Sequence, residues 1–256
     1  MSKYTVCFKF DANAFTIEDL VGLIMPTISF SINWYRSIDI APRGNYFNEN
    51  SILDLINNEV SEFSLKENEP GVIGQSFLYQ KMQQFNVSTI MWSVDNVDFA
   101  SMDFLSKLIS GRQLIFGCIY QSDDAFWQSV TDLTTYKQLG KSLRGLGMVK
   151  SKLFHNEMEI DISHHYGRVA TVKDMLLIAA PIMWFGPGYY KYVSKERLRH
   201  FKGADEIGNP FNDILFIRLF DHRKDPSSSK RRNLQRHFRE WVDMDGLEAS
   251  LRAVKV

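Results

Sequence analysis

The sequence predicts an α+β protein, a mostly antiparallel sheet with helices packed on it, and three observations lead to this fold class. Several short runs alternate apolar and polar residues, as half-buried strands do. Runs with helical spacing lie between them, and several begin at a capping residue. The 256 residues are 45% hydrophobic and 23% charged, close to the average globular composition. These values argue against a disordered, collagen-like or coiled-coil protein.

The first 35 residues predict a strand, a helix and a second strand. Residues 4–10 alternate between apolar and polar or smaller side chains, and residues 28–34 do so most clearly in the whole chain. Between them, Thr16 offers an N-cap with Asp19 three residues later, and the helix should end near Pro26. This order is a βαβ-like unit.

The segment up to residue 120 predicts a second unit of the same kind. Its elements are a helix over 52–60, a strand over 90–94, a helix over 104–109 that ends at Gly111, and a central strand over 114–120. The Glu-rich stretch 62–69 is interpreted as a loop or an edge. Two strand–helix–strand units are compatible with a ferredoxin-like order of elements in the N-terminal half.

The remaining elements follow a Gly- and Lys-containing stretch, 134–147, which is the candidate boundary between subdomains 1–133 and 134–256. We expect the two to pack as one compact unit. The predicted elements are a helix capped by Ser122, a strand over 158–162 with one acidic face, a helix from Thr171 to Pro181, a basic helix from Ser194 to Phe201, a buried strand over 214–220, and a last helix with Leu234, Phe238, Trp241 and Val242 on one face.

Charge is balanced in the whole chain, with 30 basic and 30 acidic residues, but not along it. Residues 1–130 hold 8 basic and 15 acidic side chains, and residues 131–256 hold 22 and 15. The two halves could attract each other within one molecule. Alternatively, one half could present a charged surface to a partner of opposite sign.

The sequence predicts a cytoplasmic protein. The N-terminus has a strand pattern and no apolar core of signal-peptide length. The longest apolar run, 175–185, contains Pro181 and is too short to span a bilayer. Cys7 and Cys118 lie in strand-like runs, where buried thiols are expected to behave as small hydrophobic groups and not as nucleophiles.

Common catalytic motifs are incomplete. Gly140-Lys-Ser142 resembles the end of a phosphate-binding loop, but that motif needs a glycine at the position of Thr135. A nucleophile elbow around Ser76 would need a glycine where Leu78 stands. We therefore expect no enzymatic activity and no cofactor.

One acidic and histidine-rich segment leaves an enzymatic interpretation open. It contains His155, Glu157, Glu159, Asp161, His164 and His165. Glu157, Glu159 and Asp161 could share one strand face, but the histidines lie at or beyond its ends. A solvated strand face is the simpler interpretation, and no metal is expected. The alternative is an enzyme of unknown type that uses His164 or His165 with Glu159 or Asp161.

Two further segments suggest surfaces. Residues 230–239 form a dense basic patch, which could attract phosphates but also has the composition of a solvated helix face, so no direct binding of nucleic acid is expected. Residues 182–192 are rich in Met and aromatics around Gly186-Pro-Gly188. Trp184 and Phe185 are expected in the core, and Tyr189, Tyr190 and Tyr192 are candidate partner contacts.

Residues 170–245 resemble bacterial immunity proteins of polymorphic toxin systems, whether contact-dependent or type VI-secreted. The likeness rests on the order of Met183-Trp-Phe-Gly186, Val193-Ser-Lys-Glu-Arg-Leu198, Ile214-Leu-Phe-Ile-Arg-Leu-Phe220 and Phe238-Arg-Glu-Trp241. The resemblance implies a cytoplasmic protein without a reaction of its own, which binds one cognate toxin domain and blocks its active site.

If the toxin is a nuclease or a nucleotide-handling enzyme such as an ADP-ribosyltransferase, acidic side chains could mimic its phosphate-bearing substrate. The candidates are Asp95, Asp98, Asp103, Asp123 and Asp124. They could instead be helix caps and strand-end turns. An adaptor that uses the aromatic turn is the other binding alternative. No contact with a membrane is expected.

Overall fold

The computed structural model describes residues 3–26, 28, 31–69, 74–95, 102–151, 157–173, 175–211 and 213–253. The strands are β1 (Tyr4–Asp11), β2 (Trp34–Ser37), β3 (Ala41–Tyr46), β4 (Glu62–Lys66), β5 (Ser76–Met82), β6 (Val87–Val94), β7 (Leu114–Gln121), β8 (Met148–Lys150), β9 (Met158–Ile160), β10 (Ala170–Val172), β11 (Met175–Leu177), β12 (Ile182–Phe185), β13 (Glu206–Phe211) and β14 (Ile214–Arg218).

The helices are α1 (Ile17–Ile24), α2 (Glu49–Asn57), α3 (Met102–Ile109), α4 (Ser122–Ser129), α5 (Leu133–Gln138), α6 (Pro187–Tyr190), α7 (Lys195–Arg199), α8 (Ser229–Val242) and α9 (Met244–Ala253). A short 3₁₀ turn covers Gln83–Phe85. No helix in the described part of the chain is both long and apolar enough to cross a membrane.

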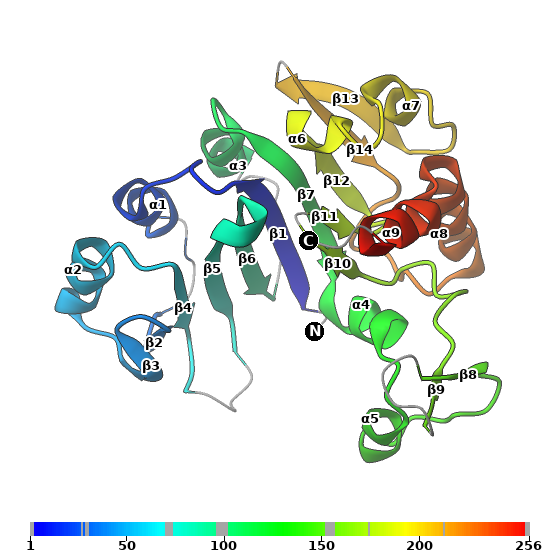
Figure 1. Cartoon of the computed structure of the whole chain (residues 1–256), viewed down its shortest axis with the longest axis horizontal. Helices are drawn as coiled ribbons and strands as arrows, with labels where there is room; N and C mark the ends of the chain where they lie inside the picture. Colours follow the sequence, from blue (N-terminus) through cyan, green and yellow to red (C-terminus); the bar gives the residue numbers. More distant parts are fainter. Residues whose placement is uncertain are drawn as a thin grey trace.

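Ten of the strands form one sheet in the order β13-β14-β12-β7-β1-β6-β5-β4-β2-β3 (Figure 1). Every neighbouring pair in it is antiparallel. The α+β class with a mostly antiparallel sheet is therefore confirmed. Two small hairpins, β8–β9 and β10–β11, lie outside this sheet.

The four strands β7-β1-β6-β5 have the order that a ferredoxin-like arrangement requires, with α1 and α3 as its two helices. The segment β2–β3–α2–β4 is inserted between α1 and β5 and extends the sheet beyond β5. The predicted order of the N-terminal half is compatible with this topology.

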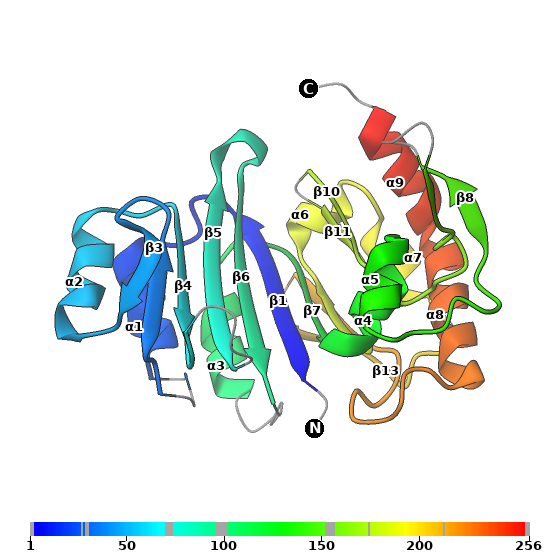
Figure 2. The same cartoon turned by 90° about the horizontal axis from the view of Figure 1, so that it is seen from below.

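Both faces of the sheet are covered, and each has its own core. Tyr4, Val6, Phe8 and Phe10 of β1 belong to the first core, which includes side chains of α1, α2 and α3. Cys7 belongs to the second core, which includes side chains of α7, α8 and α9. Figures 1 and 2 show α1–α3 around the N-terminal strands and α7–α9 around the C-terminal strands. The alternation of apolar residues in β1 thus serves two layers.

The C-terminal strands extend the same sheet. β7 pairs with β1 on one side and with β12 on the other, and β14 and β13 follow β12. The predicted subdomains 1–133 and 134–256 therefore share one continuous sheet.

Local signals placed several elements correctly. The Thr16 hydroxyl caps α1 by accepting a hydrogen bond from the Asp19 N–H at 3.1 Å. Ser194 caps α7 in the same way, through the Arg197 N–H at 3.2 Å. The predicted strands at β1, β6, β7 and β14 and the helices at α2, α3 and α8 are confirmed.

Two predictions in the N-terminal half are wrong. Ile28 and residues 31–33 are not in a strand. The Ile28 N–H bonds the Ile24 carbonyl and continues the end of α1. Residues 29 and 30 of that predicted strand lie outside the described residues. Residues 62–66 form β4, a strand between β5 and β2, and not a loop or an edge.

Two predictions of helix starts are also wrong. The segment from Thr171 forms the β10–β11 hairpin, with Lys173 at φ 54° between its strands. Ser122 does not cap α4, since its hydroxyl lies 2.8 Å from the Thr5 hydroxyl. At Ser122 a contact with a distant residue of β1 replaces the local cap.

Candidate functional site

Two of the predicted acidic contacts gather at one end of the sheet. Tyr4 pairs with Val94 of β6 and with Gln121 of β7, so Asp95 and Asp123 follow the ends of two strands that flank β1. At about 4.8 Å per strand their backbones are roughly 10 Å apart. Both side chains are exposed. Asp103 lies in the first turn of α3, and Asp98 lies outside the described residues.

Asp124 is not part of this exposed group, which corrects the expectation that it contacts a partner. Its carboxylate accepts hydrogen bonds from both terminal nitrogens of Arg232 on α8, one of them at 3.1 Å. The two side chains are only 17% and 18% exposed. Arg232 also donates to the Gln235 side chain, whose amide donates to the Ala179 carbonyl. Asp124 therefore joins the acidic half of the chain to the basic half.

The aromatic turn is largely structural. Tyr189 is fully buried beside Phe116 and Phe185, so its ring is not available to a partner and the expectation is wrong for this residue. The Tyr190 hydroxyl lies 2.7 Å from the Phe185 carbonyl and 2.8 Å from the Asp213 carbonyl, and burial raises its pKa to about 12. Tyr192 is half-buried, with the Lys191 ammonium 4.8 Å from its ring centre.

The acidic and aromatic candidates do not form one surface. The end of β12 pairs with the start of β7, since Phe185 lies opposite Phe116, and the aromatic turn follows there. Asp123 follows the other end of β7. A strand of eight residues spans roughly 25 Å at about 3.4 Å per residue. A partner on one group therefore reaches the other only if it covers the length of the sheet.

A projecting part of the molecule carries a surface that the sequence analysis missed. We call residues 122–151 and 157–162, which contain α4, α5, β8 and β9, the α4–β9 lobe (Figures 1 and 2). Nine large hydrophobic side chains are exposed in the described part of the chain, and five of them lie on this lobe. They are Phe126 (45%), Leu139 (57%), Met148 (39%), Val149 (40%) and Met158 (47%).

Contacts within the lobe hold this surface in place. The Trp127 ring packs edge-on against Phe126 and Tyr136, and the Tyr136 hydroxyl donates to the Trp127 carbonyl at 3.1 Å. The hairpin is attached to the α4–α5 connection, because the Ile160 N–H donates to the Thr131 carbonyl at 2.9 Å. The segments that carry the exposed apolar groups are therefore joined by hydrogen bonds and ring contacts.

One segment of the lobe is basic. Segment 133–151 contains four basic residues, Lys137, Lys141, Arg144 and Lys150, and no acidic one. All four are exposed, and none has an ion pair with any residue that the structure describes. Lys141 lies 5.0 Å from the centre of the Trp127 ring. A segment with four basic residues and no acidic one, which also contains Leu and Met, is the sequence signal that could have indicated this surface.

Asp123 connects the acidic end of the sheet to the lobe. It precedes Phe126 by three residues on α4, so both side chains lie on the same exposed helix face. The acidic end of the sheet and the first apolar side chain of the lobe are therefore adjacent on α4.

The basic helix α8 is less available than its sequence suggests. Arg232 is paired with Asp124, and Arg239 is buried and shares the Asp245 carboxylate with Arg168 at 2.6 Å each. Arg231 donates to the Ser228 hydroxyl and to the Asp225 carbonyl. These arginines make contacts within the protein. The basic residues of α8 are therefore not simply a solvated helix face.

In the described part of the histidine segment, side chains contact nearby backbone groups. His165 Nδ1 lies 3.2 Å from the Gln128 carbonyl, and burial lowers the pKa of this histidine. The Asp161 carboxylate accepts the Ser163 N–H, which lowers the pKa of Asp161. No group of three His, Cys, Asp or Glu side chains placed to hold a metal occurs among the described residues, and His155 lies outside them.

The two cysteines are buried thiols that face each other across β1 and β7. Burial raises the pKa of the Cys118 thiol well above its usual range. Such a thiol is protonated at neutral pH, which agrees with the small hydrophobic role expected of it.

Comparison of the chain with protein-family models and with curated protein sequences gave no match.

Proposed function

We propose that this protein is an immunity protein that binds a cognate bacterial toxin domain and blocks its active site, with the α4–β9 lobe as its principal contact surface. The observation that carries the proposal is the concentration of exposed apolar side chains on this lobe. Contiguous exposed apolar groups with a polar rim are typical of protein-binding sites. The resemblance of residues 170–245 to immunity proteins supports the choice of partner.

The charges of the segment 133–151 specify the partner further. Segment 133–151 holds Leu139, Met148 and Val149 together with four exposed basic side chains that form no ion pair with the described residues. A toxin face with an apolar centre and acidic residues around it is complementary to this arrangement. Electrostatic attraction of this kind accelerates association more than it raises affinity, so the association rate should fall as salt concentration rises.

Substrate mimicry by the acidic end of the sheet is a second way of blocking a toxin. Asp95 and Asp123 are exposed roughly 10 Å apart, at about the strand spacing given above, and Asp123 adjoins Phe126 of the lobe. In this case the toxin's phosphate-binding residues would contact the two aspartates, and the lobe would contact another part of the toxin surface. Replacing both with Asn should then weaken inhibition.

The test begins with purification of tagged protein from the organism that encodes it, followed by identification of the protein bound in stoichiometric amount. The captured protein should be a toxin domain whose activity stops at one equivalent. The variant Met148→Glu/Met158→Glu places carboxylates in the apolar surface, and we expect Kd to rise at least tenfold and protection of cells to be lost.

The matched control is Leu53→Glu, an equally drastic change at a side chain on α2 that is 56% exposed. It should leave Kd unchanged within about twofold, since an exposed site outside the interface contributes little. Unchanged affinity of the Met148/Met158 variant would contradict the lobe as contact surface. A stoichiometric partner without toxic activity would instead identify an adaptor.

A further inference from the structure

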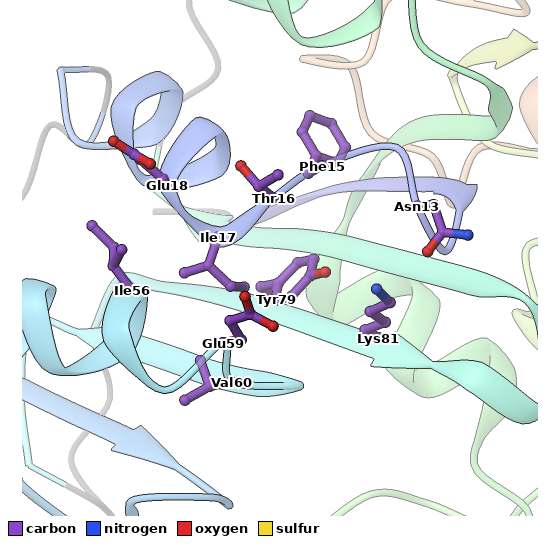
Figure 3. Close-up of a pocket in the computed structure, with 10 residues that line it drawn as sticks. All are labelled: Asn13, Phe15, Thr16, Ile17, Glu18, Ile56, Glu59, Val60, Tyr79 and Lys81. Carbon is purple, nitrogen blue, oxygen red and sulfur yellow. The ribbon is translucent and has the colours of Figure 1, made fainter.

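A pocket lies between α1, the turn after α2, and β5, in the N-terminal half and away from the α4–β9 lobe (Figure 3). Its volume is about 440 Å³, within the usual range of roughly 300–1,000 Å³ for small-molecule sites. The residues that line it are Asn13, Phe15, Thr16, Ile17, Glu18, Ile56, Glu59, Val60, Tyr79 and Lys81.

Tyr79 lines the pocket, and its hydroxyl has no hydrogen-bond partner among the described residues. The residue as a whole is 1% exposed. Burial raises the pKa of Tyr79 to about 12, so the hydroxyl is a neutral donor at physiological pH. A ligand in the pocket would satisfy it.

Charges of both signs line the same pocket. Lys81 is half-buried, and neither it nor Glu59 or Glu18 forms an ion pair within 4.0 Å among the described residues. Figure 3 shows Ile17 and Glu59 beside Tyr79, Lys81 further along β5, and Glu18 pointing away from them. Opposite charges that share a cavity but stay apart leave room for a ligand that carries both signs.

The first turn of α1 adds backbone N–H donors, and Glu59 follows α2 in a left-handed conformation. In the first turn of α1, Thr16 accepts the Asp19 N–H, while the N–H groups of Ile17 and Glu18 have no helical partner. Glu59 has φ 44°, a left-handed conformation that favours glycine or asparagine at this position after a helix. The Glu59 N–H donates to the Ile56 carbonyl, so this conformation ends α2 and fixes where the Glu59 side chain begins.

We propose that this pocket binds a zwitterionic α-amino compound with an aliphatic side chain, such as a free amino acid. Its carboxylate would meet Lys81, the Tyr79 hydroxyl and the N–H groups of α1. Its ammonium would meet Glu59, and its side chain would lie on the apolar groups of the pocket, which are Phe15, Ile17, Ile56 and Val60. This site is separate from the surface proposed for toxin binding.

The experiment is calorimetric titration of the full chain with L-leucine, N-acetyl-L-leucine and L-leucinamide. The second probe lacks the ammonium and the third lacks the carboxylate, so each should bind at least tenfold more weakly than L-leucine. Absence of L-leucine binding up to millimolar concentration would overturn the proposal. Equal binding of all three probes would overturn the assignment of a zwitterion.

Three variants locate the site. Lys81→Met and Glu59→Gln should each raise the Kd for L-leucine about tenfold, and Tyr79→Phe about threefold to tenfold. Tyr79→Phe removes an oxygen that has no partner among the described residues, so it should leave the Tm unchanged and separates ligand binding from folding. Lys66→Met, at a half-buried lysine on β4 outside the pocket, is the control and should bind L-leucine normally.

Binding that none of the three pocket variants weakens would place the ligand elsewhere and overturn the proposal. The result is independent of toxin binding. Lys81→Met should still protect cells against the toxin, because the α4–β9 lobe is untouched, and loss of protection in Met148→Glu/Met158→Glu should not alter L-leucine binding.

Discussion

Asp123 and Asp124 are neighbours in the first turn of α4, yet their surroundings differ completely. Asp123 is exposed at the end of the sheet, whereas Asp124 is paired with Arg232 in a site where each side chain is less than a fifth exposed. Arg232 is 108 residues away in the sequence. One aspartate is thus available to a partner and the other contributes to the stability of the fold.

We expect Asp124→Ala to lower the free energy of unfolding by about 3 kcal/mol, because it leaves the Arg232 guanidinium buried without its counter-charge. Asp123→Ala is the matched control and should change stability by less than about 0.5 kcal/mol. Urea unfolding followed by circular dichroism measures both. Equal effects of the two substitutions would show that the Asp124–Arg232 pair does not stabilise the fold.

Several features at this scale follow from local sequence. The cap at Thr16 needs only the residues of its own turn, and the pattern that predicted it is confirmed. The role of Tyr189 does not follow in this way, because a tyrosine beside Gly188 can face the solvent or the core. The packing of Phe116 and Phe185 decides that it is buried.

Among the elements, β7 shows how close packing depends on one small residue. Gly117 lies opposite Phe8 of β1, and a Cβ at position 117 would come within 2.3 Å of the Phe8 ring. Phe8 is fully buried and also packs against Trp184 at 5.4 Å. The glycine is therefore required for the ring to lie flat over the central strand.

Gly117→Ala should destabilise the protein by about 2–3 kcal/mol, because the added methyl group displaces an aromatic ring in a close-packed core. Gly208→Ala on the edge strand β13 is the control, since a methyl group there would meet no described atom within 4 Å, and it should have little effect. Thermal unfolding compares the two. Adding Phe8→Leu to Gly117→Ala should restore part of the loss, and independent, additive effects would contradict this packing argument.

Elements were predictable where their own periodicity is strong. The alternation in β1 and the apolar run in β7 led directly to strands. The segment 28–34 has an equally clear alternation, but of its described residues only Trp34 lies in a strand, and Ile28 and Ile32 pack on the first core instead. Alternation therefore reports burial on one side and does not by itself establish a strand.

At the scale of the whole molecule, one sheet connects the two predicted subdomains. β1, β7 and β12 have their side chains in both cores, so neither core is complete without strands from the other half. The Asp124–Arg232 pair adds a link of opposite charges between the halves. This link agrees with the interpretation that the acidic and basic halves attract each other within one molecule.

We therefore expect a single cooperative unfolding transition. Differential scanning calorimetry should give a calorimetric enthalpy equal to the van't Hoff enthalpy, because the shared strands prevent one half from unfolding alone. Intrinsic fluorescence and far-UV circular dichroism should follow the same curve. Two separate transitions, or different midpoints for the two probes, would show that residues 1–133 and 134–256 unfold independently.

The sequence by itself determined the α+β class, most of the helices, and four strands of the large sheet, β1, β6, β7 and β14. These features depend on periodicity and capping within a few residues, where the chain's own pattern is the dominant influence. It also indicated the uneven charge and the absence of complete catalytic motifs.

Only the tertiary structure decided which charges remain exposed and where the surfaces lie. Asp124 became an internal partner of Arg232, the apolar side chains of the α4–β9 lobe stayed outside, and Tyr79 met Lys81 and Glu59 in one pocket. The physical reason is that burial and pairing are set by neighbours across strands and layers. In this antiparallel sheet those neighbours come from segments up to about a hundred residues apart, as with Asp124 and Arg232.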